Sequence, residues 1–130
     1  MKKQIWCCMK LLSVGGALYG GIELLWRKYT HWSMILTGGI CFTILFKIFA
    51  RMTSCSLWIK CCIGSTVITY VEFISGFFLN YCLRWKVWDY SHCRFNFCGQ
   101  ICLIYSIFWG LLTVPVSALC RFLHRKLHWE

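Results

Sequence analysis

Two glutamates interrupt long apolar segments in a chain of 130 residues that has only four acidic side chains. Gly16, Gly20 and Glu23 lie at offsets of zero, four and seven residues, which places them on one face of a helix. Glu72 ends a stretch with the same spacing of small and hydroxyl-bearing residues. A carboxylate at membrane depth costs about 2.5–3.5 kcal/mol or more, so it should face protein or water and have a partner. Glu72 and Glu23 are therefore candidates for a ligand or ion pathway.

Both glutamates also have a purely structural interpretation. Arg27 lies one helical turn after Glu23 and could form an ion pair with it. Glu72 lies about 12 Å of helix rise before Asn80, well inside its segment. No basic residue of that segment reaches it easily, so it must stay protonated or meet a donor from another helix. The residue pattern leaves function and structural hydrogen bonding open.

A second stretch of unusual chemistry is WDYSHCRFN, residues 88–96, which separates two apolar runs. Asp89 and Ser91 can bond nearby backbone amides in turns, and Asn96 can cap the helix that follows. Asp89 could also pair with Arg84 or Arg94. Because Trp and Tyr gather at the membrane–water boundary, we expect an aromatic, hydrogen-bonded lid there. Its signature residues are Trp88, Asp89, Tyr90, Ser91 and Asn96.

The composition indicates which elements must position these residues. Hydrophobic residues make up 59% of the chain and charged residues 14%, against about 45–50% and about 25% in ordinary soluble domains. A soluble chain of this size would leave large apolar patches in water. We therefore predict an all-α, polytopic membrane protein with one transmembrane domain over residues 1–130. Its four expected transmembrane helices cover residues 5–26, 33–50, 57–80 and 99–120, with a short basic tail at 121–130.

The basic residues predict the orientation. Nine of the 14 Lys and Arg residues lie at the two termini and the second loop, which favours cytoplasmic termini in a multi-pass protein. The net charge of +10 suits anionic headgroups of a lipid bilayer, so we expect no nucleic-acid partner.

The chain also contains an internal repeat. Each glutamate segment is followed by a basic and aromatic link and then by a similar tetrapeptide, GGIC at 38–41 and GQIC at 99–102. This pattern predicts two pseudo-repeated helical hairpins related by an axis along the membrane normal. Small residues let helix backbones approach closely in lipid. The expected helix-packing positions are Gly16, Gly20, Gly76 and Gly110.

The eleven cysteines do not predict a metal site, because no CxxC…CxxC spacing occurs. Most lie in apolar runs, where free Cys behaves as a small hydrophobic residue. Cys82, Cys93 and Cys98 flank the third loop, where one disulfide remains open. Of the candidate metal-ligand pairs, His124 with His128 stands on the basic tail and lacks a third ligand, as does Asp89 with His92. We expect no metal, no cofactor and no enzyme activity.

Several motifs together resemble a known family. They are YVEFISG at 70–76, WDYS at 88–91, FN at 95–96, GQICL at 99–103 and WG at 109–110. In this combination the chain resembles bacterial integral membrane proteins assigned as ABC-transporter permeases of a type IV class, related to a group named CmpB. A weaker likeness, in GGALYGGIELLWR and HWSM, extends to the first hairpin. Gln100 departs from the family, which often has Arg there, so a basic partner for Glu72 or Asp89 is in doubt.

The resemblance implies a permease-like transport component of the bacterial cell membrane with an intramembrane acidic site. The chain has no GxxxxGK[ST] stretch, so any ATPase would be a separate subunit. A proton-coupled transporter of four-helix size would instead work as a homo-oligomer. The alternative function is a non-transport membrane anchor, or an assembly and interaction protein that binds other helices through its small-residue stripes.

Overall fold

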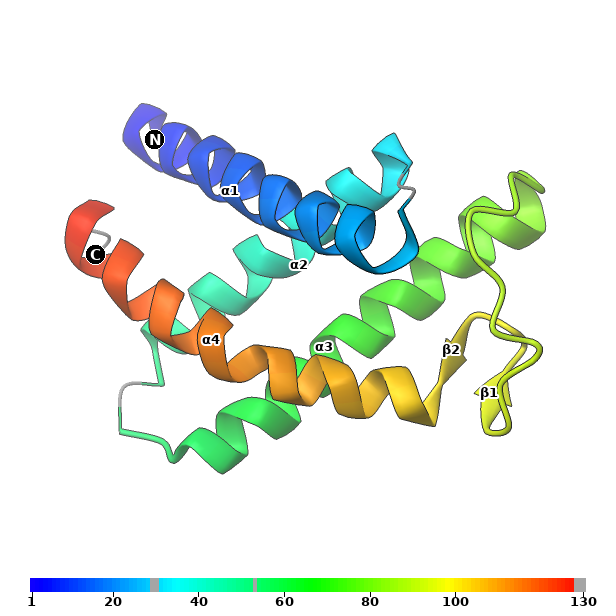
Figure 1. Ribbon diagram of the computed structural model, residues 1–130. Helices are drawn as coiled ribbons and strands as arrows, with labels where there is room; N and C mark the ends of the chain where they lie inside the picture. Colours follow the sequence, from blue (N-terminus) through cyan, green and yellow to red (C-terminus); the bar gives the residue numbers. More distant parts are fainter. Residues whose placement is uncertain (29–30, 53, 128–130) are drawn as a thin grey trace. The chain divides into compact units, whose positions relative to one another are not determined.

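The computed structural model describes residues 1–28, 31–52 and 54–127. Four long helices dominate it, and each is long and apolar enough to cross a membrane (Figure 1). They are α1 (Lys2–Arg27), α2 (Trp32–Ala50), α3 (Leu57–Gly76) and α4 (Leu103–Leu127). A π-helix at Phe77–Cys82 continues α3, and two short strands, β1 (Asn96–Phe97) and β2 (Ile101–Cys102), precede α4. The predicted all-α membrane fold is confirmed.

Local signals explain where the helices begin and end. Long apolar runs must satisfy their backbone groups within the segment in lipid, which favours helices. The Nδ1 atom of His31 accepts a hydrogen bond from the amide of Ser33 at the start of α2, and the Ser56 hydroxyl accepts one from Ile59 at the start of α3. Lys28 ends α1 in the left-handed conformation, with φ of 57°.

The chain divides into two compact units. The first unit contains residues 1–54 and 115–130, and the second contains residues 55–114. Each unit holds a helical hairpin, formed by α1 and α2 in the first and by α3 and the N-terminal half of α4 in the second. The prediction of one domain over residues 1–130 stays a prediction.

Glycines set the packing of α1 on α2 in the first unit. A Cβ atom on Gly39 would lie 2.5 Å from the carbonyl oxygen of Leu12, and one on Gly16 would lie 2.9 Å from that of Ile35. Gly20 is less crowded, because its Cβ atom would meet only the Ile35 side chain, at 3.2 Å. The two backbones therefore approach so closely that Gly16 and Gly39 leave no room for a side chain.

In the second unit, hydroxyl groups hold α3 against α4. The Ser65 hydroxyl donates to the carbonyl oxygen of Ser106 at 2.7 Å, and the Thr69 and Ser106 hydroxyls lie 2.9 Å apart. Gly64 packs against Thr113 without room for a Cβ atom, whereas a Cβ atom on Gly110 would make only ordinary contacts at 3.6 Å. This α3–α4 seam occupies the helix face that ends in Glu72.

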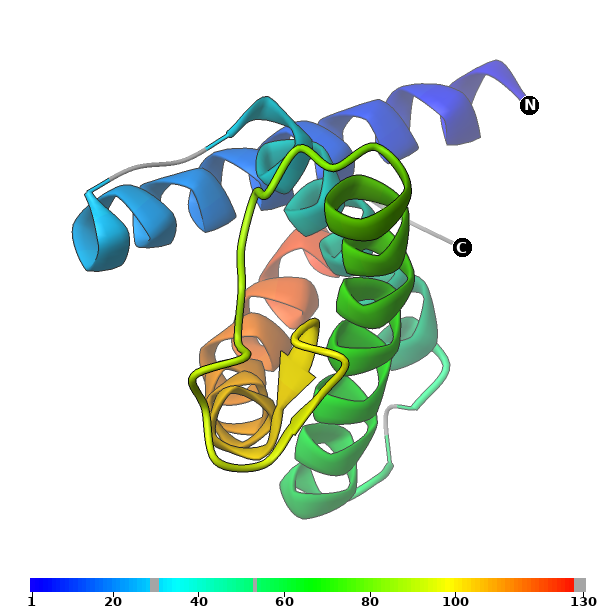
Figure 2. The ribbon, with the colours of Figure 1, turned by 90° about the vertical axis from the view of Figure 1, so that its right-hand side faces the viewer.

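The fourth span begins later than predicted. Residues 99–102 were expected in the helix, but β2 pairs with β1 in an antiparallel hairpin, with Asn96 opposite Cys102 and Phe97 opposite Ile101. Gly99 forms part of the turn in the left-handed region, at φ of 72°. Figure 2 shows the loop after the π-helix running to this hairpin beside the first turns of α4. The helix also continues past residue 120, the predicted end, to Leu127.

Close packing at Gly39 predicts a position-specific cost. We expect Gly39→Ala to lower the free energy of unfolding by about 1–3 kcal/mol, because the new methyl group meets the backbone of Leu12. Gly21→Ala is the matched control on α1, since nothing lies within 4 Å of its Cβ position. Unfolding in detergent followed by circular dichroism measures both variants. Equal stability of the two would contradict the close approach.

Candidate functional site

The carboxylate of Glu72 is held inside the second unit. Glu72 is only 5% exposed, and both its oxygens accept hydrogen bonds. The Tyr90 hydroxyl donates to Oε1 at 2.7 Å, and the Trp109 indole nitrogen donates to Oε2 at 3.0 Å. The predicted donor from another helix is therefore Trp109 of α4, and the 88–96 loop adds a second donor.

Helix α4 places Trp109 at the carboxylate. Trp109 is 8% exposed and lies one helical turn after Ser106, the residue through which α4 binds Ser65 and Thr69. The hydrogen bonds that join the two helices therefore also fix the position of the Trp109 indole along α3, next to Glu72. A tryptophan ring has little conformational freedom once buried, so the donor is held in place.

Tyr90 reaches Glu72 because the loop folds back over the unit. Its ring stacks on that of Tyr105 in α4, with centroids 4.8 Å apart and planes at 16°. Its amide donates to the carbonyl oxygen of Gly99 at 2.8 Å, and its own carbonyl accepts from Cys93 at 2.9 Å. Ring stacking thus holds the side chain of Tyr90, and the two backbone hydrogen bonds hold its main chain.

Asn80 anchors the start of this loop from the π-helix. Its Oδ1 atom accepts hydrogen bonds from the amides of Val87 and Trp88, at 2.6 and 3.3 Å. Its Nδ2 atom donates to Oε1 of Gln100 at 2.9 Å. One side chain therefore ties the end of the third span to both sides of the loop, and π-helical turns of this kind are frequent at functional sites.

Trp88 and Gln100 dock on a glycine of α3. Trp88 is 4% exposed, and its indole nitrogen donates to the carbonyl oxygen of Gln100 at 3.0 Å. A Cβ atom on Gly76 would lie 2.5 Å from Oε1 of Gln100 and 2.7 Å from the Trp88 ring. Gly76 thus admits the loop against the helix. Gln100 binds Asn80 through an acceptor oxygen that an arginine lacks, so this departure from the family has its own structural role.

Asp89 and Asn96 stabilise turns rather than ion pairs or a helix end. The Asp89 carboxylate accepts from the amide of Ser91 at 2.8 Å, and this bond lowers its pKa, with a smaller effect from the charge of His92. The expected pairing of Asp89 with Arg84 or Arg94 is absent from the described loop. Asn96 bonds the carbonyl of Cys93 at 2.7 Å and the amide of Gly99 at 3.1 Å. Because α4 begins at Leu103, the prediction that Asn96 caps that helix is wrong.

The cysteines beside the site are free thiols. Cys82, Cys93 and Cys98, the candidates for a disulfide, form no disulfide in the described part of the structure. Cys102 at the end of β2 is buried, and burial raises the pKa of its thiol. The Cys93 thiol and the charge of Glu72 raise this pKa further, while a backbone hydrogen bond with Tyr105 partly offsets them. Cys102 therefore stays neutral beside Glu72.

Glu23, the other candidate, lies in the first unit. It is 8% exposed on α1, on the helix face of Gly16 and Gly20. The side chain of its predicted partner, Arg27, lies outside the described part of the structure. His128, of the candidate metal pair with His124, also lies outside the described residues. Of the two glutamates, Glu72 is thus the one whose surroundings define a site.

A small cavity opens on the α3–α4 seam close to this site. It has a volume of about 440 Å³, and Thr69, Ser106, Phe73 and Phe97 contribute to its lining. Thr69 stands one helical turn before Glu72 on α3, and Glu72 itself is not among the residues that line the cavity.

Three important residues were missed by the sequence analysis. From the sequence, Asn80 marks only the end of a span, Gln100 only the loss of a charge, and Trp109 only part of a family motif. For Trp109 a signal was present, because it precedes Gly110 on a helix with a polar stripe that includes Ser106. For Asn80 no spacing in the chain indicates a bond to residues 87, 88 and 100.

Chemically, the arrangement is a buried carboxylate bound by two neutral donors. Such a group can accept a proton or a small cation if the hydrogen bonds from these donors weaken. Since the Tyr90 hydroxyl donates directly to Oε1, loading of Glu72 and the position of the Tyr90 loop are linked by the same hydrogen bond.

Comparisons with known proteins support the same class. A family model described as "Putative ABC-transporter type IV", of the CmpB group, matches residues 21–129. This range includes Glu72 and the whole 88–96 loop. Searches of curated proteins and of solved structures found no match.

Removal of one donor from Glu72 should destabilise the second unit. We expect Tyr90→Phe to lower the free energy of unfolding by about 1–3 kcal/mol, because it leaves a buried carboxylate oxygen without its donor. Tyr81→Phe is the matched control, since Tyr81 is 68% exposed. Denaturant titration in detergent reports both variants. A loss of the same size in each would count against the Tyr90 bond.

The Asp89 turn should show a defined pH dependence. Because the folded pKa of Asp89 lies below its ordinary value, its stabilisation is complete above the ordinary Asp pKa of about 3.9 and is lost as the pH falls through the lowered one. We expect Asp89→Ala to increase deuterium uptake in segment 84–96 near neutral pH. Wild type and variant should converge in unfolding midpoint at strongly acidic pH. A constant difference across the titration would refute the role of the ionised carboxylate.

Proposed function

The chain belongs to the CmpB family of type IV ABC-transporter-related membrane proteins, and from that premise we propose that it is a permease-like transport component with Glu72 as its intramembrane acidic site. The observation that carries the proposal is the burial of this carboxylate in a membrane-spanning helix with a donor on each oxygen. Glu72 would bind the proton or cation that moves with, or triggers, transport.

The energetic argument favours a role beyond packing. An ionisable group in a membrane segment costs several kcal/mol, and an apolar residue would fill the same volume without that cost. Here two aromatic donors from different elements, Tyr90 and Trp109, are placed on one carboxylate. Intramembrane carboxylates with such dedicated partners typically mark proton or ion pathways.

The proposed mechanism couples loading of Glu72 to the loop. A proton or cation on Glu72 would neutralise the carboxylate, so loading weakens the charge-assisted hydrogen bond from Tyr90, which is one of the contacts between the loop and the helices. The loop remains attached through Asn80, whose bonds to Val87 and Trp88 do not involve the carboxylate. Tyr90 would then act as a latch and Asn80 as its hinge. The cavity at Thr69 and Ser106 would give access from the surface of the unit.

The same proposal covers partners and location. The chain itself has no P-loop, so ATP hydrolysis would come from a separate subunit, and our proposal assigns no enzyme activity to this protein. A homo-oligomer would complete a path that one copy of four helices is too small to enclose. The excess of Lys and Arg at the termini and second loop would place both termini in the cytoplasm of a bacterial cell.

Flux through reconstituted protein tests this function. We expect Glu72→Gln to abolish proton-linked or cation-linked flux in proteoliposomes, because the amide is similar in shape and does not titrate. Glu72→Asp should keep part of the flux, since it retains a carboxylate. Tyr81→Phe, an exposed change, should leave the flux intact. Circular dichroism of each reconstituted variant checks that it is folded.

Two outcomes would overturn the proposal. One is equal flux from wild type and folded Glu72→Gln. The other is no flux from wild type with candidate ions, substrates and an added ATPase subunit. The second outcome would favour the membrane anchor or assembly protein, for which the glycine and hydroxyl stripes would be contact surfaces.

A further inference from the structure

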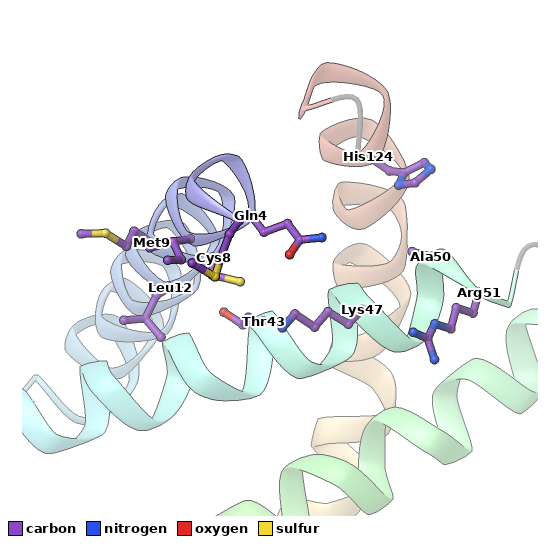
Figure 3. Close-up of a pocket in the computed structure, with 11 residues that line it drawn as sticks. Gln4, Cys8, Met9, Leu12, Thr43, Lys47, Ala50, Arg51 and His124 are labelled. Atoms are coloured by element: carbon purple, nitrogen blue, oxygen red, sulfur yellow. The ribbon is translucent and has the colours of Figure 1, made fainter. Parts of the chain in front are cut away.

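A larger cavity lies in the first unit, and the residues that line it all differ from those of the Glu72 site. Its volume is about 920 Å³, near the upper end of ordinary ligand pockets, which are about 300–1,000 Å³. Residues from the start of α1, the end of α2 and the end of α4 line it, including Gln4, Lys47 and His124 (Figure 3). Figure 3 shows Gln4 extending from α1 above α2, where Lys47 lies along the helix.

The polar part of this cavity is basic. Lys47 and Arg51 contribute two permanent positive charges, and none of the lining residues that the structure describes is acidic. The Nδ1 atom of His124 is buried and has no hydrogen-bond partner among the described residues. Lys47 and Arg51 remain exposed, so their charged groups are available to a ligand. Lys47 and Arg51 therefore offer donors and positive charge to an anion.

The position of the cavity fits the membrane boundary. Its lining runs from the start of α1 to Leu12, along the second half of α2 from Thr43 to Arg51, and includes His124 near the end of α4. The cavity therefore includes the ends of three spans. The first turn of α1 adds backbone N–H groups that have no partner within the helix. Basic pockets at such ends bind phosphate-bearing headgroups of lipids.

The other wall of the cavity is apolar. Ile5, Met9 and Leu12 of α1 line it, and Ile5 and Met9 are more than half exposed. A free inorganic anion would leave this wall and most of the volume unused. A ligand with a phosphate and an acyl or other apolar portion would contact both walls.

From these features we propose that the α1–α2–α4 cavity is a binding site for a phosphate group, contacted by Lys47 and Arg51, with His124 in its lining. The phosphate can belong to a lipid headgroup or be free in solution, and the apolar wall predicts that the lipid binds more tightly. This site is independent of Glu72 and of the proposed transport function.

Binding by the purified full-length protein tests the site. Native mass spectrometry from detergent would measure affinity for three probes: phosphatidylglycerol, inorganic phosphate, and diacylglycerol with the same acyl chains. We expect Lys47→Gln with Arg51→Gln to weaken phosphatidylglycerol binding by about tenfold or more. Lys86→Gln with Arg94→Gln removes the same charge from exposed loop positions of the second unit and should leave the affinity unchanged. Thermal unfolding of both double variants checks the fold.

The three probes separate the sources of the phosphate. Tight binding of phosphatidylglycerol alone assigns the site to a lipid headgroup, whereas comparable binding of inorganic phosphate assigns it to a free anion. Either result supports the proposal if the Lys47 and Arg51 double variant loses binding of that probe. The proposal fails if diacylglycerol binds as well as phosphatidylglycerol, if neither phosphate probe binds, or if the two double variants lose affinity equally.

Discussion

The second unit is organised around one buried carboxylate and the two hydrogen bonds that make its burial tolerable. Glu72 cannot sit in an apolar span without partners, and no basic residue of its own helix reaches it easily. Trp109 therefore has to come from α4, and Tyr90 from the connecting loop. This requirement explains why the loop folds back onto the helices, although its aromatic residues would also suit the membrane–water boundary. It also explains why Gly76 is present where the loop docks.

The two units use the same plan with different chemistry. In the first, Gly16 and Gly20 turn toward Ile35 of α2, and contact is made by backbone and apolar groups. In the second, the residues seven and three positions before the glutamate are Ser65 and Thr69, and they bind Ser106 of α4. In both units the stripe that leads to a glutamate faces the second helix of the hairpin. Close packing at glycines brings the helices of the first hairpin together, whereas directional hydrogen bonds fix the register of the second at Glu72.

Much of the fold follows from the sequence because lipid leaves few alternatives for long apolar runs. The helices, and the burial of Glu72 and Glu23, were predictable from composition and spacing. The loop was not, since its structure depends on contacts between residues far apart in the chain. Asn96 shows the difficulty, because a cap and a turn require the same side-chain chemistry, and only the pairing of β1 with β2 decides between them. Asn80 acts through a π-helix, which has no clear signal in a single sequence.

The central claim is that Tyr90 and Trp109 donate to the Glu72 carboxylate, and infrared spectroscopy of the protein in lipid tests it most directly. A carboxyl band that disappears in Glu72→Gln would identify the group. The structure predicts that Tyr90→Phe and Trp109→Phe each shift the frequency of this band, whereas Tyr81→Phe leaves it in place. A Glu72 band that keeps its frequency in both donor variants would contradict the account.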